Sequence, residues 1–218
     1  MTSTTTASIA TYHPATSTAL VAAGAVAGPL FVIAGFAQLP FREGLDPTKH
    51  AFSFLLIGPD GWLQATVFVV VGLLFTASGI GLRSTIGGRS GVVAAVFAGL
   101  LGIGLVVAGL NAPQPSFGYP IGAPQGPPEV LTTASVLHGV GFGIGILGLV
   151  GLLVTLGVAL RRKAPGAAVP AFVAAVLLPV VPMTSMQPLG TVFLYTVMTA
   201  AFAATAVALT AVRRTTGR

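Results

Sequence analysis

Charge is scarce in this sequence, and its scarcity decides the class of protein. Only 6% of the 218 residues are charged, whereas soluble globular domains carry about 25%. Hydrophobic residues make up 54% of the chain, and the mean hydropathy is +0.95. Because so few charges cannot cover a surface that faces water, we expect the apolar excess to contact lipid.

The chain also lacks cysteine. This absence excludes disulfides, thiolate metal sites and cysteine catalysis. No P-loop and no G-x-S-x-G nucleophile elbow occurs. Gly139, Gly141 and Gly143 lie within an apolar run that no strand precedes, which excludes a dinucleotide fingerprint. The net charge of +6 does not indicate nucleic-acid binding, because the basic residues stand singly or in short groups between apolar runs.

Long apolar runs predict an all-α fold, an integral membrane bundle of six helices. Crossing a bilayer core takes about 20 apolar residues. Six segments meet this length, at about 18–39, 61–82, 90–111, 132–160, 166–183 and 189–212. The fifth is short and contains prolines, so a five-helix alternative with a re-entrant fifth segment stays open. Residues 1–17 are predicted to be a disordered tail, and 213–218 a basic tail.

Basic residues predict the orientation of these spans. Under the six-helix arrangement, eight of them fall on one side: Arg83, Arg89, Arg161, Arg162, Lys163, Arg213, Arg214 and Arg218. Arg42, Lys49 and all four acidic residues fall on the other. The positive-inside rule then predicts a multi-pass protein of the cell membrane with both termini cytoplasmic. The two long loops, 40–59 and 112–128, would form an external cap.

The first long loop carries local structural signals. Asp46 can cap a helix, and Pro47 suits its first turn. The sequence predicts a short helix over 48–57, ended by glycine and proline. Trp62, the only tryptophan, stands where an aromatic residue at the membrane interface belongs.

A seam of small residues marks the fourth predicted span. His138, Gly141, Gly145, Gly148 and Gly151 recur at three- and four-residue steps and share one helix face. Such seams let membrane helices approach closely. Close packing is the favoured interpretation, and a pocket wall is the alternative.

Ionisable residues near a membrane core indicate function by default. All candidates lie toward the predicted outer side, where they would line a polar pocket: Asp46, His50, Asn111, Glu129, His138 and Gln187. His138 and Asp46 could act as acid and base, and His50 is a further catalytic candidate. The structural alternatives are an interhelical hydrogen bond for His138 and a helix-terminal role for both Asp46 and Glu129. The spacing does not support a metal site.

Several short motifs resemble the DUF998 family. They are Asp46-Pro47-Thr48-Lys49-His50 followed by Ser53 and Gly61-Trp62, then Gly79-Ile80-Gly81-Leu82-Arg83, Gly118-Tyr119-Pro120-Ile121-Gly122, and Leu137-His138-Gly139. The resemblance covers most of the chain. It implies a multispan bacterial membrane protein, generally of six helices and without an established general activity. By motif position its marked residues are Asp46, His50, Ser53, Trp62 and His138. Members often carry an acid-proline pair where this chain reads Asn111-Ala112-Pro113.

The sequence therefore predicts a membrane protein that binds a lipid or small amphiphile in an outward-facing pocket. The expected lining residues are Asp46, His50, Ser53, Trp62, Asn111, Glu129 and His138. The alternatives are an enzyme acting on a lipid or isoprenoid and a small transporter. We expect no cofactor, no metal and no nucleic acid as partner. Membrane lipids and a lipid-like small molecule are the expected partners, and the oligomeric state stays open.

Overall fold

The computed structural model describes residues 14–184 and 189–216. Helix α1 begins at Pro14, earlier than the predicted start at residue 18. The rest of the predicted tail, residues 1–13, and Gln187 lie outside the described residues.

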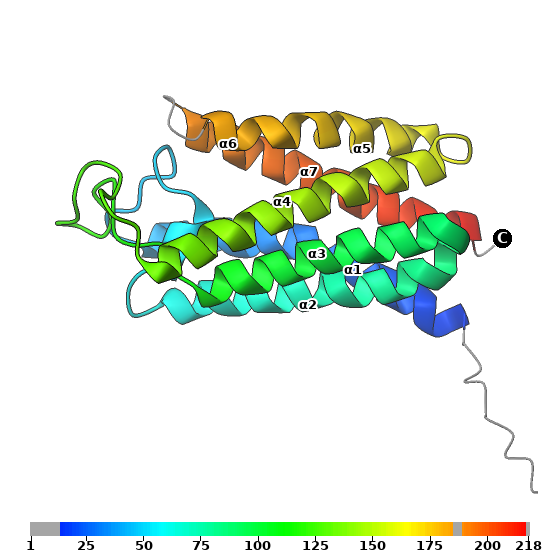
Figure 1. Ribbon diagram of the computed structural model, residues 1–218, viewed down its shortest axis with the longest axis horizontal. Helices are drawn as coiled ribbons and strands as arrows, with labels where there is room; N and C mark the ends of the chain where they lie inside the picture. The colour runs from blue at the N-terminus through cyan, green and yellow to red at the C-terminus, as the bar shows by residue number, and fades with distance from the viewer. Residues whose placement is uncertain (1–13, 185–188, 217–218) are drawn as a thin grey trace, which may run out of the picture.

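Within the described residues the fold is all-helical (Figure 1). The helices are α1 (Pro14–Gln38), α2 (Gly61–Ile86), α3 (Gly88–Leu110), α4 (Thr133–Leu160), α5 (Pro165–Leu177), α6 (Val181–Thr184) and α7 (Gly190–Thr216), with short 3-10 turns η1 (Leu39–Phe41), η2 (Phe52–Leu56) and η3 (Leu178–Val180). In this part of the chain six helical segments are long and apolar enough to cross a membrane. The prediction of a six-helix bundle is therefore confirmed.

The fifth segment runs through η3 into α6 along the length of the bundle (Figure 1). Its apolar stretch, Pro165–Met183, is itself long enough to span. Pro165 is in the first turn of α5, where a missing N–H costs no hydrogen bond. Pro170 is inside α5, and the segment continues through Pro179 in η3 and Pro182 in α6, so the prolines do not end it.

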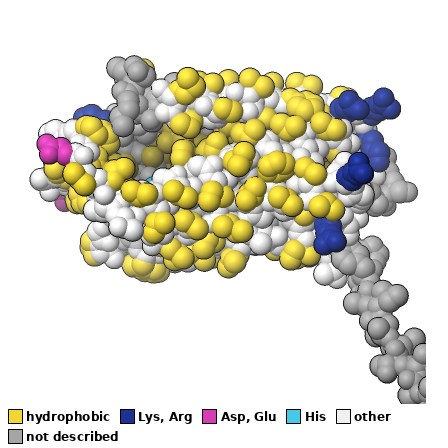
Figure 2. Space-filling view, viewed as in Figure 1, with side chains coloured by type: hydrophobic (Ala, Val, Ile, Leu, Met, Phe, Trp, Pro, Cys, Tyr) yellow, Lys and Arg dark blue, Asp and Glu magenta, His cyan; other side chains and the backbone are white. Residues whose placement is uncertain are grey.

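The bundle has two chemically different ends (Figure 2). At one end, here called the loop end, the connections 39–60 and 111–132 form a cap and carry the four acidic residues. The other, here called the basic end, holds the α2–α3 and α4–α5 connections and the last turn of α7. Apolar side chains cover the face between the two ends (Figure 2). This is the surface pattern of a protein that spans a bilayer.

The glycine seam of α4 packs against α3. A Cβ atom at Gly141 would lie 2.8 Å from the Gly104 carbonyl oxygen, and one at Gly148 would lie 2.8 Å from the Leu101 Cα atom. The backbones of α3 and α4 therefore touch, which favours association where lipid supplies no hydrophobic driving force.

The helix predicted over 48–57 is replaced by two smaller pieces. The Asp46 carbonyl accepts from the backbone N–H of Lys49 at 2.9 Å and of His50 at 2.8 Å, which closes a turn. Ala51 is then extended, with φ −69° and ψ 166°. Helical backbone resumes only in η2, Phe52–Leu56. The cap is thus a folded turn followed by a short 3-10 helix.

Candidate functional site: the cap and the cavity beneath it

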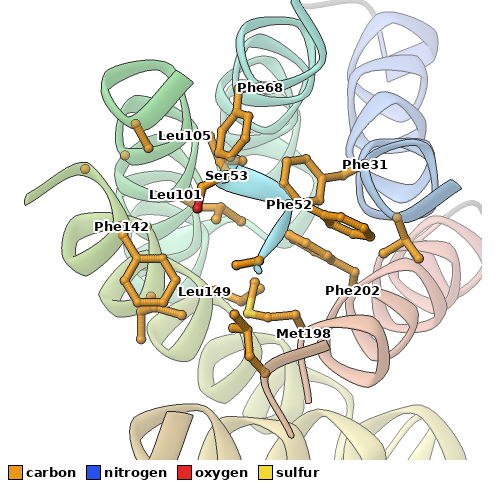
Figure 3. Close-up of a pocket in the computed structure, with 18 of the residues that line it drawn as sticks. Phe31, Phe52, Ser53, Phe68, Leu101, Leu105, Phe142, Leu149, Met198 and Phe202 are labelled. Carbon is orange, nitrogen blue, oxygen red and sulfur yellow. The ribbon is translucent and has the colours of Figure 1, made fainter. Parts of the chain in front are cut away.

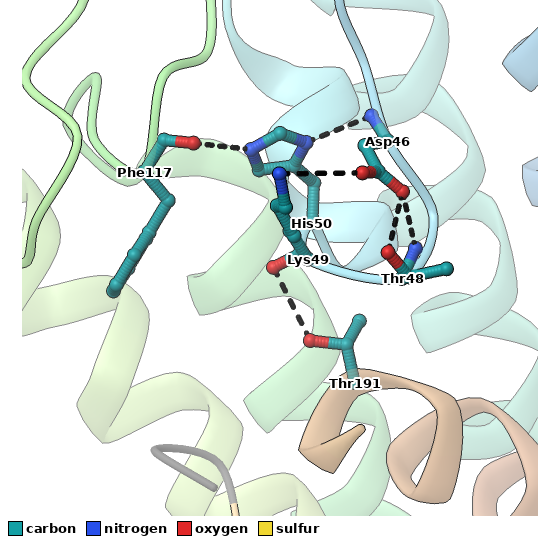
Figure 4. Close-up of polar contacts among 6 residues, drawn as sticks. All are labelled: Asp46, Thr48, Lys49, His50, Phe117 and Thr191. Atoms are coloured by element: carbon teal, nitrogen blue, oxygen red, sulfur yellow. Dashed lines mark hydrogen bonds and ion pairs between the residues drawn. The ribbon is translucent and has the colours of Figure 1, made fainter. Parts of the chain in front are cut away.

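His50 joins the two loops of the cap (Figure 4). Its side chain is 2% exposed and accepts at Nδ1 from the Asp46 backbone N–H at 2.9 Å. Its Nε2 lies 3.0 Å from the carbonyl oxygen of Phe117 in the second loop. Because a carbonyl can only accept, Nε2 carries the proton and the ring is a neutral donor–acceptor bridge.

The Asp46 carboxylate is engaged within its own turn. Its Oδ1 accepts from the Thr48 hydroxyl at 2.7 Å and from the Thr48 backbone N–H at 2.9 Å. Lys49 Nζ lies 3.6 Å from Oδ2. The Thr48 hydroxyl, then its N–H, and after these Lys49 hold the pKa of this carboxyl below its usual value of 3.8, although burial acts in the opposite direction. Asp46 thus stabilises a turn and stays ionised.

Helix α7 forms two hydrogen bonds to the first loop of the cap. The Tyr195 hydroxyl donates to the His50 carbonyl at 2.7 Å, and the Thr191 hydroxyl donates to the Lys49 carbonyl at 3.2 Å. Both bonds join the first loop to the last span. They fix the cap over the interior of the bundle.

Arg42 is the buried cation of the cap. Its side chain is 6% exposed; it donates to the Asp60 carbonyl at 2.6 Å and to the Leu55 carbonyl at 3.3 Å. The Asp60 carboxylate is 3.7 Å away. A planar guanidinium with five donors can satisfy several acceptors at once, so Arg42 holds the segment that leads into α2.

His138 completes the end of α3. Its Nδ1 lies 2.9 Å from the carbonyl oxygens of both Ala108 and Asn111. The proton is therefore on Nδ1, which donates to two carbonyls at the helix terminus, and the Ala108 carbonyl also accepts from the Asn111 backbone N–H at 3.4 Å. This is the structural interhelical bond. In the neutral ring Nε2 is then an acceptor, and it has no hydrogen-bond partner among the described residues.

A cavity of about 90 Å³ lies beneath the cap (Figure 3). Phe31, Phe52, Phe68 and Phe202 form an aromatic wall in which Phe31 contacts the other three edge-on or tilted, with ring centroids 4.9–6.0 Å apart. Leucines of α3 and α4 and Met198 of α7 line much of the remainder. The sequence predicts a polar pocket here, whereas the cavity is mainly apolar.

Few polar side chains face this cavity. Ser53 of η2, His138 of α4, and Tyr195 and Thr199 of α7 are among its lining residues. The Ser53 oxygen is directed into the space (Figure 3). In the part of the chain that the structure describes, neither the Ser53 nor the Thr199 hydroxyl has a hydrogen-bond partner. The cavity therefore offers unused polar groups and no charged lining residue.

The predicted site residues do not all meet. Ser53 and His138 line the cavity, whereas Asp46 and His50 lie in the cap and are not lining residues. Asn111 caps α3, and its side chain donates to the Val107 carbonyl at 2.8 Å. No hydrogen bond joins Asp46 to His138 within the described residues, so the expected acid–base pair is not assembled.

Two further candidates lie at the surface of the loop end. Trp62 is 62% exposed in the first turn of α2, where an interfacial aromatic is expected. Glu129 is exposed and precedes α4 instead of starting it. The N-cap of α4 is Thr132, whose hydroxyl accepts from the Ser135 N–H at 3.2 Å. Among the described residues no group of three or more His, Cys, Asp or Glu side chains could hold a metal ion.

Sequence reasoning does not find two important partners. The Phe117 carbonyl belongs to the backbone and leaves no signal in the residue type. Tyr195 has a weak signal, since a tyrosine near a span end suits the membrane interface. Its hydroxyl instead faces the inside of the bundle and binds the cap.

A family model described as "Protein of unknown function (DUF998)" matches residues 25–210. No curated protein and no solved structure matches. The matched segment includes the cap, the cavity and nearly all of the six spans. The chain therefore belongs to the DUF998 family of proteins of unknown function.

Proposed function

We propose that this membrane protein binds part of a lipid or small amphiphile in the cavity beneath its cap. The observation that carries the proposal is the lining: an aromatic and aliphatic wall that includes polar groups without partners. Binding sites for small hydrophobic molecules combine these features, with the polar groups fixing orientation.

The volume limits how much of a ligand enters. An engineered apolar cavity of about 150 Å³ stays dry and binds benzene. This cavity, at about 90 Å³, is smaller. It suits a segment of an acyl or isoprenoid chain, while the remainder of the molecule stays in the bilayer.

The side chains around the cavity favour an entrance from the bilayer. Phe142 and Ile146 of α4 and Leu194 and Met198 of α7 line it and are only half-buried. Helix α4 meets the α5–α6 segment at the basic end and diverges from it toward the loop end (Figure 1). The surface is hollowed in this region (Figure 2). A ligand could enter from the side without leaving the apolar layer.

The polar groups select the chemistry of the bound part. His138 Nε2 is an acceptor, and the Ser53 and Thr199 hydroxyls can donate or accept. With no charged lining residue, an ionised group would be buried without a counter-ion. The favoured ligand carries a neutral oxygen function, such as an alcohol or ester, beside its chain.

Gly145 offers a direct test. A Cβ atom there would meet nothing closer than 4.0 Å outside its own helix, and the residue lines the cavity. Gly145→Leu should therefore fill the cavity without breaking the α3–α4 contact. Gly143→Leu is the matched control, because Gly143 is exposed and a Cβ atom there meets nothing within 4 Å.

The probe is a long-chain fatty alcohol with a terminal diazirine, photolysed in detergent-solubilised protein. The original protein and Gly143→Leu should be labelled on peptides that contain Phe142 and Met198. Labelling should fall at least several-fold in Gly145→Leu, with Gly145→Ala as a milder variant. Equal labelling of those peptides in both leucine variants would refute the proposal.

We also propose that the basic end faces the cytoplasm, as the positive-inside rule indicates. The absence of cysteine permits a clean test with Ser90→Cys at the basic end and Val130→Cys at the loop end, both at exposed positions. A membrane-impermeant maleimide should label only Val130→Cys in intact cells. If only Ser90→Cys were labelled, the basic end would face outward and the proposed orientation would be wrong.

A further inference from the structure

A second hollow lies at the opposite end of the bundle, between α5 and α7. It has a volume of about 810 Å³. Its floor consists of small side chains from both helices, among them Ala167, Ala206 and Ala211. Val207, 51% exposed, forms part of its apolar wall. The groove therefore offers apolar contact over the width of two helices.

Two cations stand at the end of this groove. Lys163 precedes α5, and Arg214 is in the last turn of α7; both line the groove and are exposed. Neither forms an ion pair with a described residue, since the ion pairs there involve Arg42 and Lys49 at the loop end. All four acidic residues are in the loop-end connections, so no acidic side chain at this end neutralises the two cations.

Neighbouring residues strengthen the positive field. Arg161 and Arg162 precede Lys163 in the α4–α5 connection, and Arg213 precedes Arg214. The Arg213 Nε atom is buried and has no hydrogen-bond partner among the residues that the structure describes. Basic side chains gather at this end in the space-filling view (Figure 2). Basic pockets between membrane helices are the usual places where anionic lipid headgroups bind.

We propose that this groove binds an anionic glycerophospholipid from the leaflet at the basic end. An acyl chain would lie along the alanine floor, and the phosphate would lie between Lys163 and Arg214. Guanidinium and ammonium groups form short, strong hydrogen bonds to phosphate oxygens. The site is independent of the cavity beneath the cap, because it is at the other end, uses other residues and takes a charged headgroup.

Lipid selectivity in nanodiscs tests the proposal. The protein is placed in phosphatidylcholine discs with a minor fraction of phosphatidylglycerol, and the lipid retained by the released protein is measured by native mass spectrometry. Each basic residue near an anionic lipid contributes about fivefold in affinity. The double variant Lys163→Gln/Arg214→Gln should therefore bind phosphatidylglycerol about 30-fold more weakly.

The matched control removes the same charge from the same end. Arg83→Gln/Arg89→Gln alters the last turn of α2 and the first turn of α3, and leaves the groove intact. It should retain phosphatidylglycerol. Ala206→Phe, which fills the groove and keeps both cations, should lose it. If both double variants lose lipid equally, the effect is general electrostatics and the proposal fails. It also fails if Ala206→Phe binds normally, or if inorganic phosphate alone displaces the lipid.

Discussion

His50→Phe is the sharpest test of how the cap is held. Phenylalanine preserves a ring beside Phe54 and Tyr119, which lie 5.1 and 5.5 Å from the imidazole centroid. It removes the acceptor for the Asp46 N–H and the donor to the Phe117 carbonyl. The change therefore separates hydrogen bonding from packing.

The magnitude follows from these two lost bonds. Leaving a buried donor or acceptor unsatisfied costs about 1–3 kcal/mol. Both groups are in loops that can regain water when they open, so we take the lower end, about 2 kcal/mol in total. The opening of the cap should then be favoured about 30-fold. Hydrogen exchange of peptides over 44–50 and 112–126, followed by mass spectrometry, should quicken by that factor.

Thr48→Val is the control for this experiment. It removes a hydroxyl that donates to Asp46 within one turn and forms no hydrogen bond to a described residue of the second loop. Exchange should change near Thr48 and stay the same over 112–126. If His50→Phe leaves exchange of the second loop unchanged, the imidazole does not join the loops. If exchange rises equally in all helices, the effect is global unfolding, which also refutes the argument.

Three other predictions each concern the hydrogen bonds of one side chain. His138→Leu removes the donor shared by two carbonyls at the end of α3, including that of Asn111. In a denaturant titration in micelles it should lower the free energy of unfolding by about 1–2 kcal/mol. An unchanged free energy of unfolding would contradict the hydrogen bond. The Thr48 hydroxyl lowers the pKa of Asp46 and so stabilises the folded protein when this carboxyl is ionised. This stabilisation is present at pH values above the usual pKa of 3.8, and it is lost as the pH falls through the lowered pKa. An NMR titration of labelled aspartate should give a midpoint below 3.8 that Thr48→Val moves upward. Arg42→Met removes the donor to two carbonyls and should speed proteolysis within residues 55–60. Arg42→Lys should restore part of the protection. Equal rates of proteolysis for both variants would show that neither the charge nor the donors of Arg42 protect this segment.

Some site residues were within reach of the sequence, and others were not. Ser53 and His138 line the cavity, and each stands in a motif that resembles the family. The sequence predicts Asp46 as the N-cap of a helix over 48–57; that helix is replaced by a turn, within which the Asp46 carboxylate contacts Thr48 and Lys49. The error concerned assembly. Asp46 and His138 belong to one predicted pocket by depth alone, but depth does not give direction: Asp46 bonds within its own turn, and His138 bonds to the end of α3.

The sequence by itself determined the spans and the segregation of charge, because both depend on contiguous residues. An apolar run long enough to cross a bilayer needs no partner to be recognised. Tertiary structure alone decided the rest. The bond from His50 reaches a backbone carbonyl 67 residues away, a partner with no side-chain signal. The cavity and the basic groove exist because helices diverge or carry small side chains where they meet. Such spaces depend on how several helices pack together, and no single segment of the sequence contains that information.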